Sequence, residues 1–266
     1  MRIKHLFILL VVAGITTITH ARDFKTTADV RYSNGADRCV LDVYYPETVE
    51  TTDSLPVIVW FHGGGLTGGG KYIPRELMTG EYIVVAPNYR YADGNGVKGC
   101  IEDAAAAVAW TIDSVANYGG DPSKLFVSGH SAGGYLTSMV GFDKRWLEAH
   151  GKSPDMIAGL FPFSGQAITH FAQRDSEGIS PLTATVDELA PLYFVSREVP
   201  PYVIICGDRE QELYGRYEEN AYLWRMLKLT GHPYVYIYEL DGYNHGDMPA
   251  PAFHIMRNHI KDLLKK

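Results

Sequence analysis

The residues best suited to chemistry form a serine-centred pentapeptide, GHSAG, at positions 129–133. It matches the pattern G-x-S-x-G, in which a nucleophilic serine sits on a sharp turn between a strand and a helix. An apolar stretch, 125–128, precedes the motif, and a helical pattern follows it to about Val140. The turn needs small residues on both sides of the serine, because two backbones pass closely there. This context predicts that Ser131 is a nucleophile presented at the N-terminus of a helix.

A second glycine-rich segment, HGGG at residues 62–65, follows the apolar run 57–61. An acyl group under attack develops negative charge on its carbonyl oxygen, and each N–H aimed at that point is worth about 10²–10³ in rate. Glycines let the backbone bend so that successive N–H groups point at one site. We therefore expect an oxyanion hole built from the N–H groups of Gly64, Gly65 and Ala132. His62 is expected to be a structural turn residue and not a base.

Residues 65–71 also fit the phosphate-loop frame G-x-x-x-x-G-K. The residue after the lysine is Tyr72, where that motif needs a serine or threonine to hold Mg²⁺. Pro74 then breaks the helix that should begin there. Nucleotide binding is therefore rejected, and the sequence predicts neither a cofactor nor a metal ion.

The general base must come from ten histidines. His245 lies in a glycine-flanked loop, 241–246, directly after the last apolar run. Such a loop returns to the carboxyl edge of a parallel sheet, where Ser131 is also expected, and the order serine, acid, histidine matches that of serine hydrolases on open sheets. His245 is therefore the predicted base.

The acid that orients the histidine is expected in the loop after the preceding apolar run, 202–206. Its carboxylate would hold the imidazole in place and stabilise the protonated form. Asp208, Glu210 and Glu212 all compete for this role on position alone.

Composition narrows the class of protein. The 266 residues are 46% hydrophobic and 21% charged, which suits one globular domain. The formal net charge is −7, and no basic stripe is visible, so a nucleic-acid partner is not expected. Three cysteines, an odd number, leave at least one thiol free and leave a Cys39–Cys100 disulfide open.

The N-terminus has the pattern of a signal peptide. Arg2 and Lys4 precede an apolar stretch at 6–15, and Thr19-His20-Ala21 places small residues where a signal peptidase cuts. We expect residues 1–21 to be removed and residues 22–266 to form the exported domain, either periplasmic or extracellular. No later segment is apolar enough to cross a membrane, so no membrane partner is expected after cleavage.

Short apolar runs alternate with helical patterns along the rest of the chain. This alternation predicts an α/β architecture, with a mostly parallel central sheet and helices on both faces. An antiparallel hairpin is expected at 26–45, around the turn signal Asn34-Gly35. The polar stretch 166–199 contains Pro181 and Pro191, and we interpret it as a small cap inserted before the penultimate strand.

Taken together, these motifs resemble esterases of the α/β-hydrolase superfamily. HGGG, GHSAGG, a PP-strand-G-x-x-acid segment at 200–210 and a late histidine occur in the family's order. The nearest subgroups are the hormone-sensitive-lipase-like enzymes and the bacterial feruloyl- or acetyl-xylan-esterase-like enzymes. The resemblance runs from about Tyr32 to the C-terminus and includes LDVYYP at 41–46 and YGGDP at 118–122. It implies that the acid is the third residue after Gly207, which is Glu210, with Asp208 as runner-up; the family usually has Asp there.

The resemblance implies a serine carboxylesterase, with acetyl or feruloyl groups on carbohydrates as candidate substrates. The signal-peptide pattern predicts that the enzyme is secreted, and the modest chain length, which leaves little room for a long acyl tunnel, predicts short-acyl esters. The substrate is a small molecule or an oligosaccharide, and the oligomeric state is left open. An amidase or arylformamidase shares the same motifs, and a non-catalytic binding protein on this fold is a further alternative. The chain contains 18 tyrosines, which suit contact with sugar rings. Those expected around the site are Tyr72, Tyr89, Tyr91, Tyr214 and Tyr243.

Overall fold

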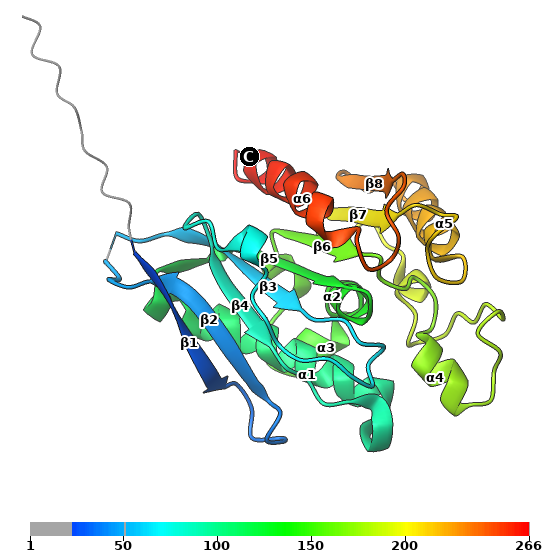
Figure 1. Ribbon diagram of the computed structural model, residues 1–266, viewed down its shortest axis with the longest axis horizontal. Coiled ribbons are helices and arrows are strands. Elements are labelled where there is room, and N and C mark those ends of the chain that lie inside the picture. Colours follow the sequence, from blue (N-terminus) through cyan, green and yellow to red (C-terminus); the bar gives the residue numbers. More distant parts are fainter. Residues whose placement is uncertain (1–22, 51, 266) are drawn as a thin grey trace, which may run out of the picture.

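An eight-stranded sheet runs through the residues that the computed structural model describes, 23–50 and 52–265 (Figure 1). The strand order is β1-β2-β4-β3-β5-β6-β7-β8. β2 pairs antiparallel with both β1 and β4, and all the other pairs are parallel. The strands are β1 (Phe24–Arg31), β2 (Val40–Pro46), β3 (Leu55–Phe61), β4 (Ile83–Pro87), β5 (Gly120–His130), β6 (Gly159–Phe163), β7 (Tyr202–Gly207) and β8 (Val235–Leu240).

Helices cover both faces of this sheet, which confirms the predicted α/β-hydrolase architecture. The α-helices are α1 (Ala92–Ser114), α2 (Ala132–Phe142), α3 (Arg145–Glu148), α4 (Phe171–Ser176), α5 (Arg216–Leu229) and α6 (Pro249–Leu263). Short 3₁₀ helices are η1 (Arg75–Leu77), η2 (Val115–Tyr118), η3 (Pro154–Met156) and η4 (Pro191–Phe194).

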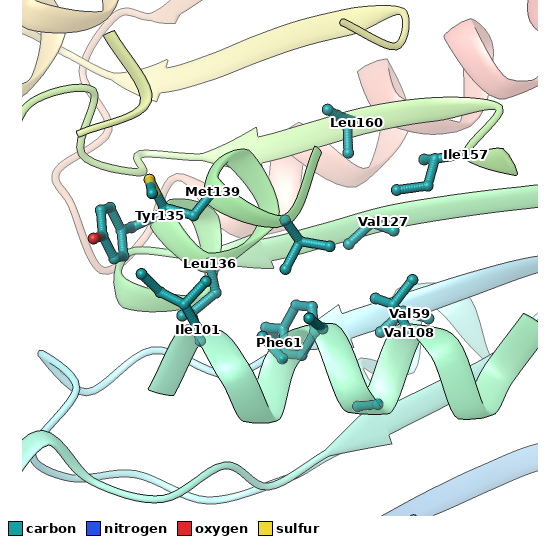
Figure 2. Packing of buried hydrophobic residues seen from close by; sticks show 14 of the residues in the cluster. Val59, Phe61, Ile101, Val108, Val127, Tyr135, Leu136, Met139, Ile157 and Leu160 are labelled. Atoms are coloured by element: carbon teal, nitrogen blue, oxygen red, sulfur yellow. The ribbon is translucent and has the colours of Figure 1, made fainter. Parts of the chain in front are cut away.

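Successive side chains of the central strand β3 enter two different cores. Val59 and Phe61 pack with α1 and α2, as Figure 2 shows with Ile101 and Leu136. Ile58 and Trp60 point to the opposite face, where residues of α6 such as Met256 cover them. Because both faces are buried, β3 is a continuous apolar run and not an alternating one. Burial of each such side chain stabilises the fold by about 1.5–3 kcal/mol.

The parallel strands align the candidate site residues at one edge. β3, β5, β7 and β8 run in the same direction, so their carboxyl ends all lie at the same edge of the sheet. The HGGG segment, Ser131, the acidic loop and the His245 loop each follow one of these ends.

The predicted hairpin is confirmed as β1 and β2, with a register irregularity between Thr27 and Val30. The α1 segment contains non-helical backbone at Asp93, Gly94 and Gly96, so its regular part begins after Gly96. All three cysteines are buried and free, and Cys39 and Cys100 are not joined.

The chain between β6 and β7 contains α4 and η4 and corresponds to the insertion interpreted as a cap. Phe171, at the start of α4, lies against the HGGG segment: a Cβ added at Gly65 would be 3.0 Å from its ring. The insertion therefore reaches the loop on which two oxyanion donors were expected.

None of the helices within residues 23–50 and 52–265 is long and apolar enough to cross a membrane. The signal peptide predicted at residues 1–21 lies outside the described residues.

Candidate active site

Ser131 lies on a strained turn between β5 and α2. Its φ of 56° and ψ of −116° are unusual for a residue with a side chain. Its N–H donates to the carbonyl of Phe163 on β6 at 2.8 Å, which ties the turn to the neighbouring strand. Gly133 passes so close to β3 that an added Cβ would lie 2.1 Å from the carbonyl oxygen of Phe61. The small residue predicted on this side of the serine is therefore required for the turn.

His245 links this serine to a carboxylate. Its Nε2 is 2.9 Å from the hydroxyl oxygen of Ser131, and its Nδ1 is 2.7 Å from Oε2 of Glu212. A carboxylate can only accept, so Nδ1 carries the proton and Nε2 is free to accept one from the serine. This is the arrangement in which a histidine acts as general base for a serine nucleophile.

Glu212 is held in place from the other side as well. Its side chain is 0% exposed. Oε1 accepts the N–H of Gly207 at 2.8 Å and the hydroxyl of Ser164. Burial alone would raise the pKa of Glu212, but the hydrogen bonds from His245, Ser164 and Gly207 outweigh it and lower the pKa to about 2. The carboxyl group is therefore charged at any pH at which the protein would work.

The acid expected from the family pattern, Glu210, does not reach His245. Glu210 is exposed, and within the described residues its carboxylate has no hydrogen-bond partner. The runner-up, Asp208, instead accepts the N–H groups of Glu210 and Gly242 at 2.9 and 2.8 Å and so joins the acidic loop to the histidine loop. The carboxylate that hydrogen-bonds His245 in the structure is thus that of Glu212, and not that of Glu210 or Asp208.

The cause is a turn that follows β7. The N–H groups of Gln211 and Glu212 both donate to the carbonyl of Asp208 at 2.9 Å. This turn leaves Glu210 at its tip and brings Glu212 back beneath the end of β7. The position of Glu212 in this loop makes it one of three candidate acids in the sequence. No residue pattern distinguishes it from Asp208 and Glu210.

The HGGG segment crosses directly beside the nucleophile. A Cβ added at Gly63 would lie 3.4 Å from Cβ of Ser131. Gly64 and Gly65 have φ values of 113° and 64°, which favour glycine. Within the described residues, the N–H groups of Gly64, Gly65 and Ala132 have no acceptor in the protein. They are thus available to a ligand, as an oxyanion hole requires.

Two other residues of this region have structural partners. His62 is buried, stacks on Tyr89 with ring centroids 4.3 Å apart, and has a pKa lowered to about 4 by burial. Lys71, the lysine of the rejected phosphate-loop frame, pairs with Asp42 at 2.5 Å and with Asp29 at 3.0 Å. In residues 23–50 and 52–265, no three or more His, Cys, Asp or Glu side chains are grouped to hold a metal ion.

The sequence is similar to proteins named as ester hydrolases. Residues 41–159 match the family model BD-FAE. The chain is 25% identical over 237 residues to the probable carboxylic ester hydrolase LipM of Mycobacterium tuberculosis, covering 81% of this chain and 55% of LipM. It is 39% identical over 103 residues to carboxylesterase NlhH of the same organism, covering 37% of this chain and 32% of NlhH. The chain thus spans about half of one relative's length and a third of the other's.

Solved structures share the fold over almost the whole chain. A truncated carbohydrate esterase from gut microbiota superposes with a TM-score of 0.74 at 17% identity, covering 91% of this chain and 97% of that one. Esterase B of Lactobacillus rhamnosis gives 0.73 at 20% identity, with coverages of 91% and 87%. The chain therefore has the α/β-hydrolase fold. Its sequence is similar to those of proteins named carboxylic ester hydrolase and carboxylesterase.

Proposed function

We propose that the protein is a serine carboxylesterase in which Ser131 attacks the ester, His245 is the base and Glu212 orients the histidine. The observation that carries this proposal is the continuous chain of hydrogen bonds from the Ser131 hydroxyl through the imidazole to the buried carboxylate. A partner of this geometry removes the serine proton as the bond to the acyl carbon forms.

The reaction proceeds in two stages. The serine oxygen adds to the ester carbonyl, and the N–H groups of Gly64, Gly65 and Ala132 receive the developing negative charge. Nε2 of His245 then passes the proton to the departing alcohol, which leaves an acyl-serine. A water molecule, deprotonated by the same nitrogen, adds to the acyl group and releases the acid.

We propose that the acyl group is short and the alcohol polar, as in acetylated carbohydrates. Three exposed tyrosines support the second part. Tyr72 follows the HGGG segment, Tyr214 lies two residues after Glu212, and Tyr243 lies two residues before His245; they are 46%, 66% and 43% exposed. Rings with hydroxyl tips suit stacking on sugars. The carbohydrate esterase among the structural relatives has the same fold.

The expectation for Tyr89 is wrong. Tyr89 is fully buried and donates its hydroxyl to the carbonyl of His62 at 2.8 Å. Tyr91 is partly exposed and donates its hydroxyl to the carbonyl of Gly69, in the loop that follows the HGGG segment.

We propose that the alcohol group extends toward a cavity beside Tyr214. A cavity of about 590 Å³ lies between the insertion and the start of α5, and Tyr214, Tyr222 and Glu218 contribute to its walls. The insertion would then cover one side of the substrate, as a cap does.

The test compares p-nitrophenyl esters from acetate to decanoate with acetylated and feruloylated oligosaccharides. We expect kcat/KM to fall with acyl length and acetate to be released from the oligosaccharides. Tyr214→Ala should raise KM for the oligosaccharide and leave p-nitrophenyl acetate hydrolysis within about twofold, since the small ester does not need the ring. A kcat/KM that rises through decanoate, with no acetate release, would overturn the proposed substrate class.

A further inference from the structure

The histidine within the serine motif, His130, contacts the base of the proposed triad. His130 is the last residue of β5, directly before Ser131. Its Nε2 is 2.8 Å from the main-chain carbonyl oxygen of His245, and the two imidazole rings lie 4.8 Å apart. The sequence alone shows His130 only as the variable position of G-x-S-x-G.

The direction of this bond is determined by the acceptor. A carbonyl oxygen can only accept, so Nε2 of His130 carries the proton. Burial lowers the pKa of His130 to about 4. Repulsion from His245 also lowers this pKa, whereas the charge of Glu212 raises it. The ring is therefore neutral near pH 7 and adds no second positive charge beside the imidazolium that forms on His245.

The opposite edge of the His130 ring, which carries Nδ1, faces the HGGG segment. A Cβ added at Gly63 would lie 3.4 Å from Nδ1 of His130 and 3.1 Å from its carbonyl oxygen. The neutral imidazole of His130 thus lies between the HGGG segment and the His245 loop, next to Ser131.

Within the His245 loop, Asn244 accepts the N–H groups of Gly246 and Asp247, and these bonds join the loop only to itself. Asp208 binds it through the carbonyl of Tyr243 and the N–H of Gly242, both before the histidine. Within the described residues, His130 is the only side chain that hydrogen-bonds the main chain of His245. This bond ties the main chain of His245 to the end of β5, the strand that leads into Ser131.

We propose that His130 is a positioning residue, which holds the His245 loop so that Nε2 of His245 stays within reach of the Ser131 hydroxyl. The inference rests on the proposed serine esterase function. In this role, His130 neither contacts the substrate nor transfers a proton. A displacement of about 1 Å at a reacting group can cost about 10²-fold in rate, so one loop hydrogen bond is enough to matter.

Two amide substitutions separate this role from simple packing. The side-chain nitrogen of glutamine in His130→Gln can occupy the place of Nε2 and donate to the same carbonyl, whereas that of His130→Asn is one bond shorter. We expect His130→Asn to lower kcat for p-nitrophenyl acetate about 10- to 100-fold with KM within about twofold. His130→Gln should stay within about fivefold of the unchanged protein.

Proton NMR gives a readout that needs no substrate. The proton between Nδ1 of His245 and Glu212 should give a far-downfield signal in the unchanged protein and in His130→Gln, and a broadened or lost signal in His130→Asn. Unchanged kcat in His130→Asn would overturn the inference. So would equal losses in both variants with an intact downfield signal. If instead Ser131→Ala keeps full esterase activity, the proposed function itself fails, while the NMR comparison still tests the contact.

Discussion

Glu212 and His245 lie 33 residues apart in the chain and meet through a 2.7 Å hydrogen bond between Oε2 and Nδ1. The carboxylate is sealed from solvent, whereas the imidazole is 17% exposed, so the charged partner is inside and the reactive nitrogen faces outward. The hydrogen bond to a carboxylate, which can only accept, fixes the proton on Nδ1 of His245 and leaves Nε2 free to face Ser131. The proposed activity of the serine therefore depends on a turn after β7 that the motif pattern does not describe.

The first prediction concerns the acid. Glu212→Gln should lower kcat by roughly 10²–10⁴, because a neutral amide neither stabilises the imidazolium nor selects the Nδ1–H tautomer. The matched change Glu210→Gln should leave kcat within about twofold, since that carboxylate is exposed and remote from His245. Steady-state kinetics on p-nitrophenyl acetate measures both. A larger loss from Glu210→Gln would return the role to the residue that the family spacing selects.

The second prediction concerns two glycines of one loop. A Cβ at Gly64 would lie 2.3 Å from the carbonyl oxygen of Gly68, and the φ of Gly64 is 113°. Gly64→Ala should distort the HGGG segment and lower kcat by about 10²-fold or more. The control is Gly68→Ala, where the added Cβ would meet only the carbonyl oxygen of Gly64 at 3.6 Å. Comparable activity in the two variants would show that Gly64 is not part of the oxyanion hole.

A third prediction follows from the low pKa of Glu212. Its ordinary value is 4.5, and the folded protein holds it at about 2. The carboxylate thus stabilises the fold fully above about pH 4.5, and this contribution of about 3 kcal/mol is lost as the pH falls toward 2. Denaturant unfolding of Glu212→Gln should therefore show a weaker pH dependence over that window than the unchanged protein. A difference between the two free energies of unfolding that does not vary from pH 5 to pH 2 contradicts this account.

The fourth prediction concerns export. If residues 1–21 are a signal peptide, protein isolated from its native host should begin near Arg22. N-terminal sequencing of the protein outside the cytoplasm measures this directly. Recovery of a chain that still begins at Met1, in the cytoplasmic fraction, would show that the leader is not cleaved.

Most of the fold could be predicted because its strands are buried on both faces. Runs such as 57–61 and 202–206 are continuous in apolar residues, and the glycines and prolines that bound them mark the connections. The ends were less predictable. α6 begins at Pro249, and proline is favoured in the first turn of a helix.

The site could be predicted only where local backbone constraints leave a mark in the sequence. Ser131 sits on a turn that needs glycines, and His245 follows the last strand in a glycine-flanked loop, so both are recognisable. Glu212 has no such constraint. Its role arises from the turn at Asp208 and from contacts with Ser164 and Gly207, and none of these is visible until the chain is folded.

The most direct test of the central claim is reaction of the folded protein with a fluorophosphonate probe, followed by mass spectrometry of the adduct and assay of p-nitrophenyl acetate hydrolysis. The account predicts one adduct, on Ser131, with loss of hydrolysis in step with labelling. It also predicts that folded Ser131→Ala takes no label and hydrolyses the ester on the order of 10⁶-fold more slowly. A folded, unlabelled wild-type protein would indicate a binding protein on this fold. Activity of Ser131→Ala within tenfold of wild type would contradict the assignment of the nucleophile.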